Sequence, residues 1–215
     1  MNRLRAALSC TLVALLCACS ETRFESTPGD NIETCDVRWK GLWTSDDAKR
    51  DEKMTAFYID DECRFFVLEQ TEKGAPFKRM HVPLNYVHAD GLDYLVIADT
   101  SLKGLVELPP IYGVKPPPDK AFFFAHYRAR QDRIDVFQVD DRRVADAVIA
   151  GKFEGTVSKT ANELHVFVRG DRTKMLEILR HGDIFVDKTD LHLVRVKQTP
   201  ADFERALIEQ QHKTP

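Results

Sequence analysis

Residues 54–70 read Met-Thr-Ala-Phe-Tyr-Ile-Asp-Asp-Glu-Cys-Arg-Phe-Phe-Val-Leu-Glu-Gln. Two runs rich in aromatic and β-branched residues, 54–59 and 63–70, flank the pair Asp60-Asp61. Aromatic and β-branched side chains favour extended backbone, whereas Asp favours turns. The stretch therefore predicts two neighbouring β-strands joined by a turn, and similar patterns recur along most of the chain.

The rest of the first half also predicts β-structure. Strands are expected at residues 37–45, 77–87 and 94–98, and the segment 89–91 (Ala-Asp-Gly) marks the turn between the last two. A loop follows at residues 108–119. Its five prolines cannot lie in a central strand, because proline lacks the N–H that a strand ladder needs.

The second half predicts further strands mixed with two short helices. Each helix follows an Asp that can cap its first turn, and each is followed by a Gly that can end it. The helices with their flanking residues are Asp140, 141–150 and Gly151, and Asp171, 172–181 and Gly182. The expected strands lie at residues 121–129, 133–139, 153–158, 163–169, 184–186 and 191–196.

These elements predict an α+β domain dominated by a curved antiparallel β-sheet, or a partly closed barrel, with two or three short helices. The third helix would begin at Thr199-Pro200, since Thr can cap a helix and Pro suits its first position. The connections are too short for a parallel α/β fold, which needs a helix between most strand pairs.

The N-terminus has the pattern of an export signal. Arg3 and Arg5 precede an apolar stretch at residues 6–16, which is shorter than the roughly 20 residues of a membrane-spanning helix. Residues 16–19, Leu-Cys-Ala-Cys, then resemble the bacterial lipobox, although Cys at the second position is unusual. This resemblance implies that residues 1–18 are a signal peptide and that Cys19 becomes the lipidated N-terminus. A buried N-terminal helix is the alternative.

The domain organisation follows from this signal. Residues 19–33 are expected to be the lipidated Cys and a flexible tether, because the segment is polar and contains Pro28-Gly29. A single β-rich domain is expected at residues 34–197, and a C-terminal tail or short helix at 198–215. Ser20 stands where an Asp would retain a lipoprotein in the inner membrane, which favours the outer membrane of a Gram-negative host.

The cysteine count predicts a disulfide under this interpretation. Cys10 and Cys17 leave with the signal peptide, and Cys19 becomes a thioether, so Cys35 and Cys63 remain as a pair in an oxidising compartment. Two free buried thiols are the alternative.

Composition and motifs argue against several functions. The formal net charge is −3, or −5 without residues 1–18, and no basic patch resembles a nucleic-acid footprint. Motifs for a serine nucleophile, a phosphate-binding loop or a zinc protease are absent. His126, His165 and His192 lie in expected strands, but their spacing is not that of metal ligands. We therefore expect no catalytic residue, no metal and no cofactor.

Aromatic residues are the remaining candidates. Trp39, Trp43 and Phe123 could form a ligand or partner surface, or they could simply belong to the core. The segment 41–43, Gly-Leu-Trp, resembles the Gly-x-Trp signature in the first strand of lipocalins, whose Trp closes the barrel floor. That resemblance would imply a carrier of an apolar ligand.

The whole chain resembles the many uncharacterised proteobacterial lipoproteins with a lipobox, a short polar segment and a β-rich domain. We therefore expect a non-enzymatic binding or scaffolding module, anchored through Cys19 at the periplasmic face of the outer membrane. Its partner would be an envelope protein or an apolar ligand. The alternatives are a lipocalin-like carrier and an envelope hydrolase whose site is assembled only by the fold.

Overall fold

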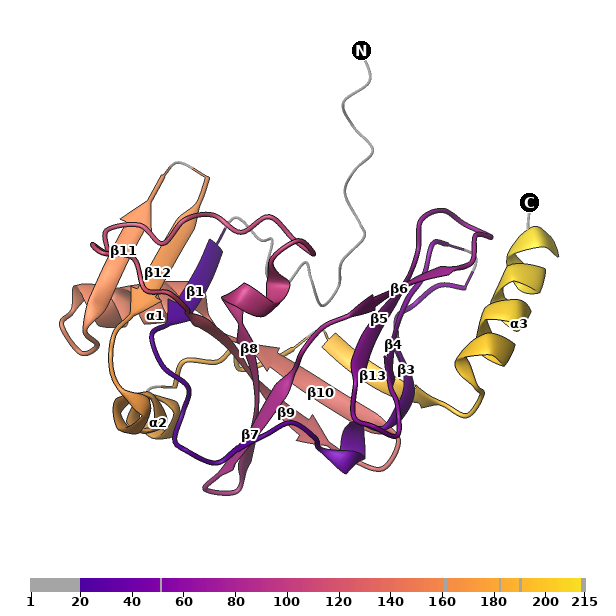
Figure 1. Ribbon diagram of the computed structural model, residues 1–215, viewed down its shortest axis with the longest axis horizontal. Helices are drawn as coiled ribbons and strands as arrows, with labels where there is room; N and C mark the ends of the chain where they lie inside the picture. The colour runs from indigo at the N-terminus through magenta and orange to yellow at the C-terminus, as the bar shows by residue number, and fades with distance from the viewer. Residues whose placement is uncertain (1–19, 51, 161, 182, 190, 214–215) are drawn as a thin grey trace, which may run out of the picture.

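A computed structural model describes residues 20–50, 52–160, 162–181, 183–189 and 191–213 of the chain. In this part of the protein, the strands form one curled sheet, and three α-helices pack against its two ends (Figure 1). The fold is α+β, with a half-barrel sheet, as the sequence predicted. Residues 1–18 and Cys19 lie outside the described residues.

The sheet follows a path of ten strands and then branches. The order along the path is β11-β12-β1-β9-β10-β13-β3-β4-β5-β6, while β8, β7 and β2 extend from the other edge of β9. The strands are β1 (Ser20–Phe24), β2 (Ile32–Glu33), β3 (Gly41–Ser45), β4 (Thr55–Ile59), β5 (Phe65–Gln70), β6 (Phe77–His81), β7 (Asn85–Ala89), β8 (Leu92–Ala98), β9 (Phe122–Ala129), β10 (Arg133–Gln138), β11 (Gly155–Lys159), β12 (Leu164–Val168) and β13 (Leu191–Val196).

The hairpin expected at residues 54–70 is confirmed as β4 and β5. The two strands pair antiparallel from Thr55 with Glu69 to Ile59 with Phe65. Phe57 and Val67 point into the half-barrel, whereas Ala56 and Leu68 point to the outer face. Successive side chains of a strand alternate between faces, so this one hairpin contributes to two hydrophobic clusters.

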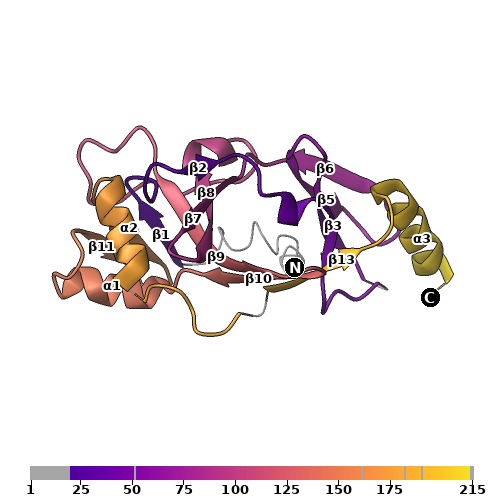
Figure 2. The same cartoon turned by 90° about the horizontal axis from the view of Figure 1, so that it is seen from below.

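Three large hydrophobic clusters and a small fourth one, which contains Val114, Ala121 and Phe167, hold the described part of the fold together. The inner cluster fills the half-barrel around Trp39, Trp43 and Tyr127. The end cluster lies between β1, β12 and the helices α1 (Asp141–Ile149) and α2 (Arg172–His181). The outer cluster lies beneath α3 (Pro200–Lys213). Figure 2 shows α1 and α2 at one end of the elongated molecule and α3 at the other.

The predicted helix caps are confirmed. The Asp140 side chain accepts a hydrogen bond from the Arg143 amide at 3.0 Å, and the Asp171 side chain accepts one from the Lys174 amide at 2.9 Å. The Thr199 hydroxyl accepts a hydrogen bond from the amide of Asp202 at 3.2 Å. Each side chain therefore satisfies an amide that has no partner within its helix. Gly182 lies outside the described residues.

Three expected strands are shorter than predicted. Residues 37–45 divide into a 3-10 helix, η1 (Val37–Trp39), and β3. Residues 77–87 divide into β6 and β7 around Pro83, which has no N–H to donate to a ladder. Residues 184–186 contribute only an isolated bridge between Phe185 and Val139.

The prediction that residues 19–33 form a flexible tether is corrected by the structure. Residues 20–24 form β1, which pairs in parallel with β12 and lies inside the sheet between β12 and β9. Phe24 carries the segment into the end cluster, where its ring stacks on Phe124 with centroids 4.3 Å apart. Residues 20–24 therefore belong to the folded domain, which was expected to begin at residue 34.

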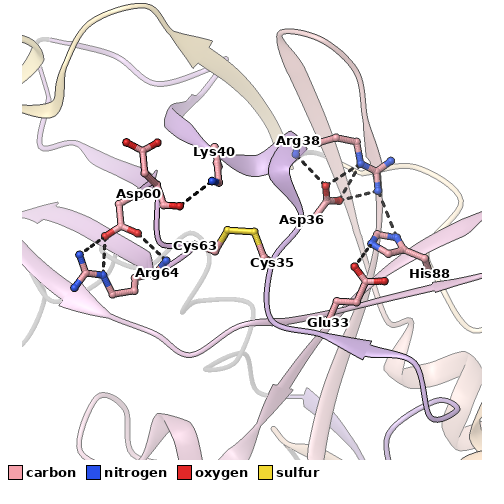
Figure 3. The surroundings of a disulfide bond; sticks show 10 residues. Glu33, Cys35, Asp36, Arg38, Lys40, Asp60, Cys63, Arg64 and His88 are labelled. Carbon is pink, nitrogen blue, oxygen red and sulfur yellow. Dashed lines mark hydrogen bonds and ion pairs between the residues drawn. A yellow bond between two sulfur atoms is a disulfide. The ribbon is translucent and has the colours of Figure 1, made fainter.

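The disulfide predicted between Cys35 and Cys63 is present. It joins the segment before η1 to the turn between β4 and β5 (Figure 3). None of the helices in the described residues is long and apolar enough to cross a lipid bilayer.

Candidate functional site

Strand β1 places two charged side chains inside the protein. Its register with β12 sets Glu21 beside His165 and Arg23 beside Phe167 on one face of the sheet. The loop that includes Pro109 and Tyr112 covers this face. The side chains of Arg23 and Glu21 are only 4% and 5% exposed, and one Arg23 nitrogen lies 2.8 Å from Glu21 Oε1. Buried charges are costly unless they are fully paired, which makes this cluster unusual.

Arg23 ties together several parts of the chain. Its guanidinium donates a hydrogen bond to the Pro109 carbonyl at 2.6 Å and lies 3.9 Å from Asp99 Oδ2. It also sits over the ring of Phe123, 5.5 Å from the ring centroid. Asp99 begins the short 3-10 helix η2 (Asp99–Leu102). Arg23 therefore connects η2, β9 and the proline-rich loop to β1.

Glu21 is the second buried charge of the site. Its Oε1 lies 3.4 Å from Nδ1 of His165, whose Nε2 lies 3.3 Å from Glu163. The Tyr112 ring packs against the His165 ring, with centroids 4.8 Å apart. This side of the cluster is thus covered by a loop side chain rather than by a strand.

The cluster is not fully satisfied by hydrogen bonds. Four buried side-chain polar atoms in the described residues have no hydrogen-bond partner there, and Glu21 Oε2 and Arg23 Nε are two of them. Most buried polar groups in proteins are paired, so an unpaired buried carboxylate oxygen and guanidinium nitrogen require a physical reason.

Two hollows lie beside this cluster, and Arg23 contributes to the lining of each. The smaller has a volume of about 10 Å³ and is lined by Glu21, Arg23 and His165 together with the loop. This is about the space that one water molecule needs. The larger has a volume of about 270 Å³. Its wall includes Arg23, Asp99, Lys103, Val106, Leu108 and Pro109. Arg23 lines both hollows.

The opposite face of β1 carries a partly buried carboxyl group, that of Asp141. The Thr22 hydroxyl donates a hydrogen bond to Asp141 Oδ1 at 2.7 Å, at the start of α1. Burial raises the pKa of Asp141 to about 6, and the negative charges of Glu21 and Asp140 add to the effect. Glu21 and His165 lie on the other face, so these three groups do not converge on one cleft.

A second charged network lies on the Cys35 side of the disulfide, where Figure 3 shows Arg38 between Asp36 and His88. Arg38 forms ion pairs with Asp36 at 2.7 Å and with Asp93 at 2.8 Å, and His88 Nδ1 lies 2.7 Å from Asp93. The hydroxyl of Tyr127 also donates to Asp36. Burial alone would raise the pKa values of Asp36 and Asp93, but the hydrogen bonds outweigh it and lower both pKa values. This network is well paired and joins η1 to β7 and β8.

The aromatic residues singled out in the sequence are core residues. Trp39, Trp43 and Phe123 all belong to the inner cluster, and the two tryptophans are fully buried. The prediction that they form a ligand or partner surface is therefore corrected in favour of the core alternative. Phe123 is nevertheless part of the candidate site, because Arg23 lies over its ring.

The strand histidines do not come together. His126 is buried, and burial lowers its pKa; its Nδ1 lies 2.9 Å from the Asp93 carbonyl oxygen. His192 lies 2.6 Å from Asp135 on a separate strand pair. Among the described residues, no group of three His, Cys, Asp or Glu side chains could hold a metal ion.

Sequence reasoning missed Glu21 and Arg23. Both were assigned to a tether because the surrounding residues are polar. The alternation of Glu21 and Arg23 with Thr22 and Phe24 was the signal, since it places the charged pair on one face of a strand. Five residues are too few for such an alternation to be distinctive.

No family model, curated protein or solved structure matches this chain. What the candidate site does must therefore be inferred from its own geometry.

Proposed function

We propose that the protein is a lipid-anchored, non-enzymatic binding module of the bacterial cell envelope. Its lipid anchor is Cys19, as the lipobox resemblance implies. Its binding site is the 270 Å³ hollow beside η2 and the proline-rich loop, where it holds a polar group of a partner. The observation that carries this proposal is the buried charge of Arg23 in the wall of that hollow.

The energetics of Arg23 favour binding over a purely structural role. An apolar pair of the same size as Glu21 and Arg23 would fold at least as well, because desolvating two charges often costs more than their attraction returns. The pair also leaves Arg23 Nε and Glu21 Oε2 without partners among the described residues. A carboxylate, phosphate or carbonyl oxygen of a partner would accept hydrogen bonds from the guanidinium in the wall of this hollow.

We place the site outside the half-barrel because the interior is filled with side chains. Trp39 contacts Tyr127 and Tyr86, with ring centroids 5.3 and 6.2 Å apart, and these two tyrosines contact each other. A lipocalin-like carrier would instead need this volume for its ligand. A hydrolase would need acid and base groups that converge on a cleft large enough for a substrate, whereas Glu21 and His165 converge on a hollow of only about 10 Å³.

Site-specific photocrosslinking in the living envelope would test this proposal. A benzophenone amino acid would replace Lys103, on the hollow, or Glu209, on the exposed side of α3. We expect one discrete adduct at position 103 and none at position 209. The adduct should disappear when Glu21→Leu and Arg23→Met are combined, because the guanidinium that holds the partner is lost. Replacing both charges leaves neither unpaired, so the fold should be retained. An adduct that survives this double substitution, or no adduct at 103, would overturn the proposal.

The two alternatives give different results. Native mass spectrometry of the mature chain would reveal an apolar ligand if the protein were a carrier. Hydrolysis of purified envelope material that is lost in Glu21→Gln would indicate an enzyme.

A further inference from the structure

Strand β1 begins at Ser20, the residue that follows Cys19. Consecutive Cα atoms lie about 3.8 Å apart, so any group carried by Cys19 is attached directly beside the sheet. We infer that the domain is held on the membrane without a tether, with the surface around the start of β1 resting on phospholipid headgroups. This inference rests on the proposed lipid anchor at Cys19.

The attachment point is a rigid part of the fold. All five residues of β1 pair with β12, and residues 21–24 are buried. Freeing a spacer from this strand would break the ladder and separate Arg23 from Glu21 and from the Pro109 carbonyl. It would also withdraw Phe24 from the end cluster. The strand therefore cannot act as the flexible tether that the sequence composition suggests.

The surface beside Ser20 fits a lipid headgroup layer. Ser20 pairs with Leu164, and Leu164 pairs with Lys159, so the turn from β11 to β12 lies at the same end as the start of β1. Lys159 and Asn162 are exposed there, and Tyr112 is 39% exposed on the loop that covers β12. Lysine and tyrosine are suited to this interface because each joins an apolar body to a polar tip.

The figures place a distant reference point on the molecule. In Figure 1 the start of β1 and the β11–β12 hairpin lie at the upper edge, whereas the turn between β9 and β10 lies at the lower edge. Gln131 is exposed in that lower turn. A membrane at the upper edge would touch Asn162 and leave Gln131 far from the lipid.

Fluorescence quenching on vesicles tests the orientation. Full-length chains with Asn162→Cys or Gln131→Cys would be acylated in cells, labelled with an environment-sensitive maleimide, and placed in vesicles of phosphatidylethanolamine and phosphatidylglycerol. Cys35 and Cys63 would not react, because they are disulfide-bonded. With a spin quencher on the lipid headgroups, we expect quenching at position 162 to be several-fold stronger than at 131. Equal quenching at the two positions would overturn the inference.

A spacer variant provides the matched control. A flexible Gly-Ser segment inserted between Cys19 and Ser20 leaves every described residue unchanged and adds the missing slack. The difference between positions 162 and 131 should then collapse, and a difference that persists unchanged would show that the missing tether does not set the orientation. Intact mass separates the two proposals. A mature chain without acyl groups overturns the anchor and this inference together, whereas an acylated chain with equal quenching overturns the inference alone.

Discussion

At the scale of single residues, Gly41 leaves room for the arginine side chain that covers the Trp43 ring. Gly41 has φ +109, and a Cβ built there would lie 2.8 Å from a terminal nitrogen of Arg195. That guanidinium lies 4.1 Å from the centroid of the Trp43 ring and donates a hydrogen bond to the Lys40 carbonyl. The Gly-x-Trp pattern noticed in the sequence thus has a local cause, because the glycine leaves room for the arginine that covers the tryptophan.

Replacing Gly41 by Ala should therefore destabilise the protein. Left-handed strain and the displacement of Arg195 together predict a loss of about 2–4 kcal/mol in the free energy of unfolding, measured by urea denaturation. Gly104→Ala is the control, since Gly104 also has a positive φ but a Cβ there would meet nothing within 4 Å. Equal losses in the two variants would contradict the role given to Arg195.

Asp141 gives a pH dependence whose sign can be worked out. Its pKa is about 6 in the fold, whereas an unfolded Asp has a pKa near 4. The protonated carboxyl favours folding, so this contribution is fully present below about pH 4 and is lost as the pH rises through about 6.

Asp141→Asn should stabilise the protein at pH 7.5 by about 1–3 kcal/mol, because it removes the cost of burying a charged carboxylate. The favourable interaction of that charge with the start of α1 reduces the gain. The variant should also lose the decline in stability between about pH 4 and 6. Denaturant titrations at several pH values would measure both effects, with exposed Asp146→Asn as the control. A lower stability of Asp141→Asn at pH 7.5 would rule this account out.

At the scale of elements, the disulfide joins two segments that share no strand pairing with each other. It closes a loop between residues 28 apart in sequence. Cys35→Ser with Cys63→Ser should lower the free energy of unfolding by about 3–4 kcal/mol on the chain-entropy account. The urea midpoint of the parent protein should fall with reductant, while that of the double variant should not change. A parent midpoint that ignores reductant would contradict this prediction.

The elements also show what a sequence can reveal. Helices α1, α2 and α3 could be located because the side chains of Asp140, Asp171 and Thr199 each accept a hydrogen bond from the amide three residues later. The β4–β5 hairpin could be predicted from the sequence for the same reason, because its turn is encoded by neighbouring residues.

Strand β1 could not be predicted from the sequence, and the candidate site depends on it. Its pairing partner β12 follows 144 residues later, and no local pattern encodes which distant strand it joins. The burial of Arg23 and Glu21 is a consequence of that pairing. The candidate site was therefore hidden from sequence reasoning, although Phe123 beneath Arg23 had been noticed.

At the scale of the whole molecule, β9 couples the inner and end clusters. Phe123 faces the inner cluster and its neighbour Phe124 faces the end cluster. Both tryptophans lie in the inner cluster, while α1 and α2 pack at the far end of the molecule (Figure 2). A sheet shared in this way predicts that the two ends unfold together.

Phe24→Ala tests this coupling. Phe24 is fully buried, so the substitution should cost about 3–5 kcal/mol. The unfolding midpoint measured by tryptophan fluorescence reports the inner cluster, and that measured by far-ultraviolet circular dichroism reports the helices. The substitution should lower both midpoints by the same amount. If fluorescence keeps its midpoint while circular dichroism shifts, the two clusters are independent.

The parallel pairing of β1 with β12 also sets an order of events as the protein is made. Glu21 and His165 lie 144 residues apart, so this contact closes one of the longest loops in the chain. Such contacts form late, because the entropy of closing the loop must be overcome first. While the chain is being synthesised, the segment beginning at Ser20 lacks its parallel partner until β12 has also emerged. If Cys19 is lipidated as proposed, the acylating enzyme would therefore act before β1 has paired with β12.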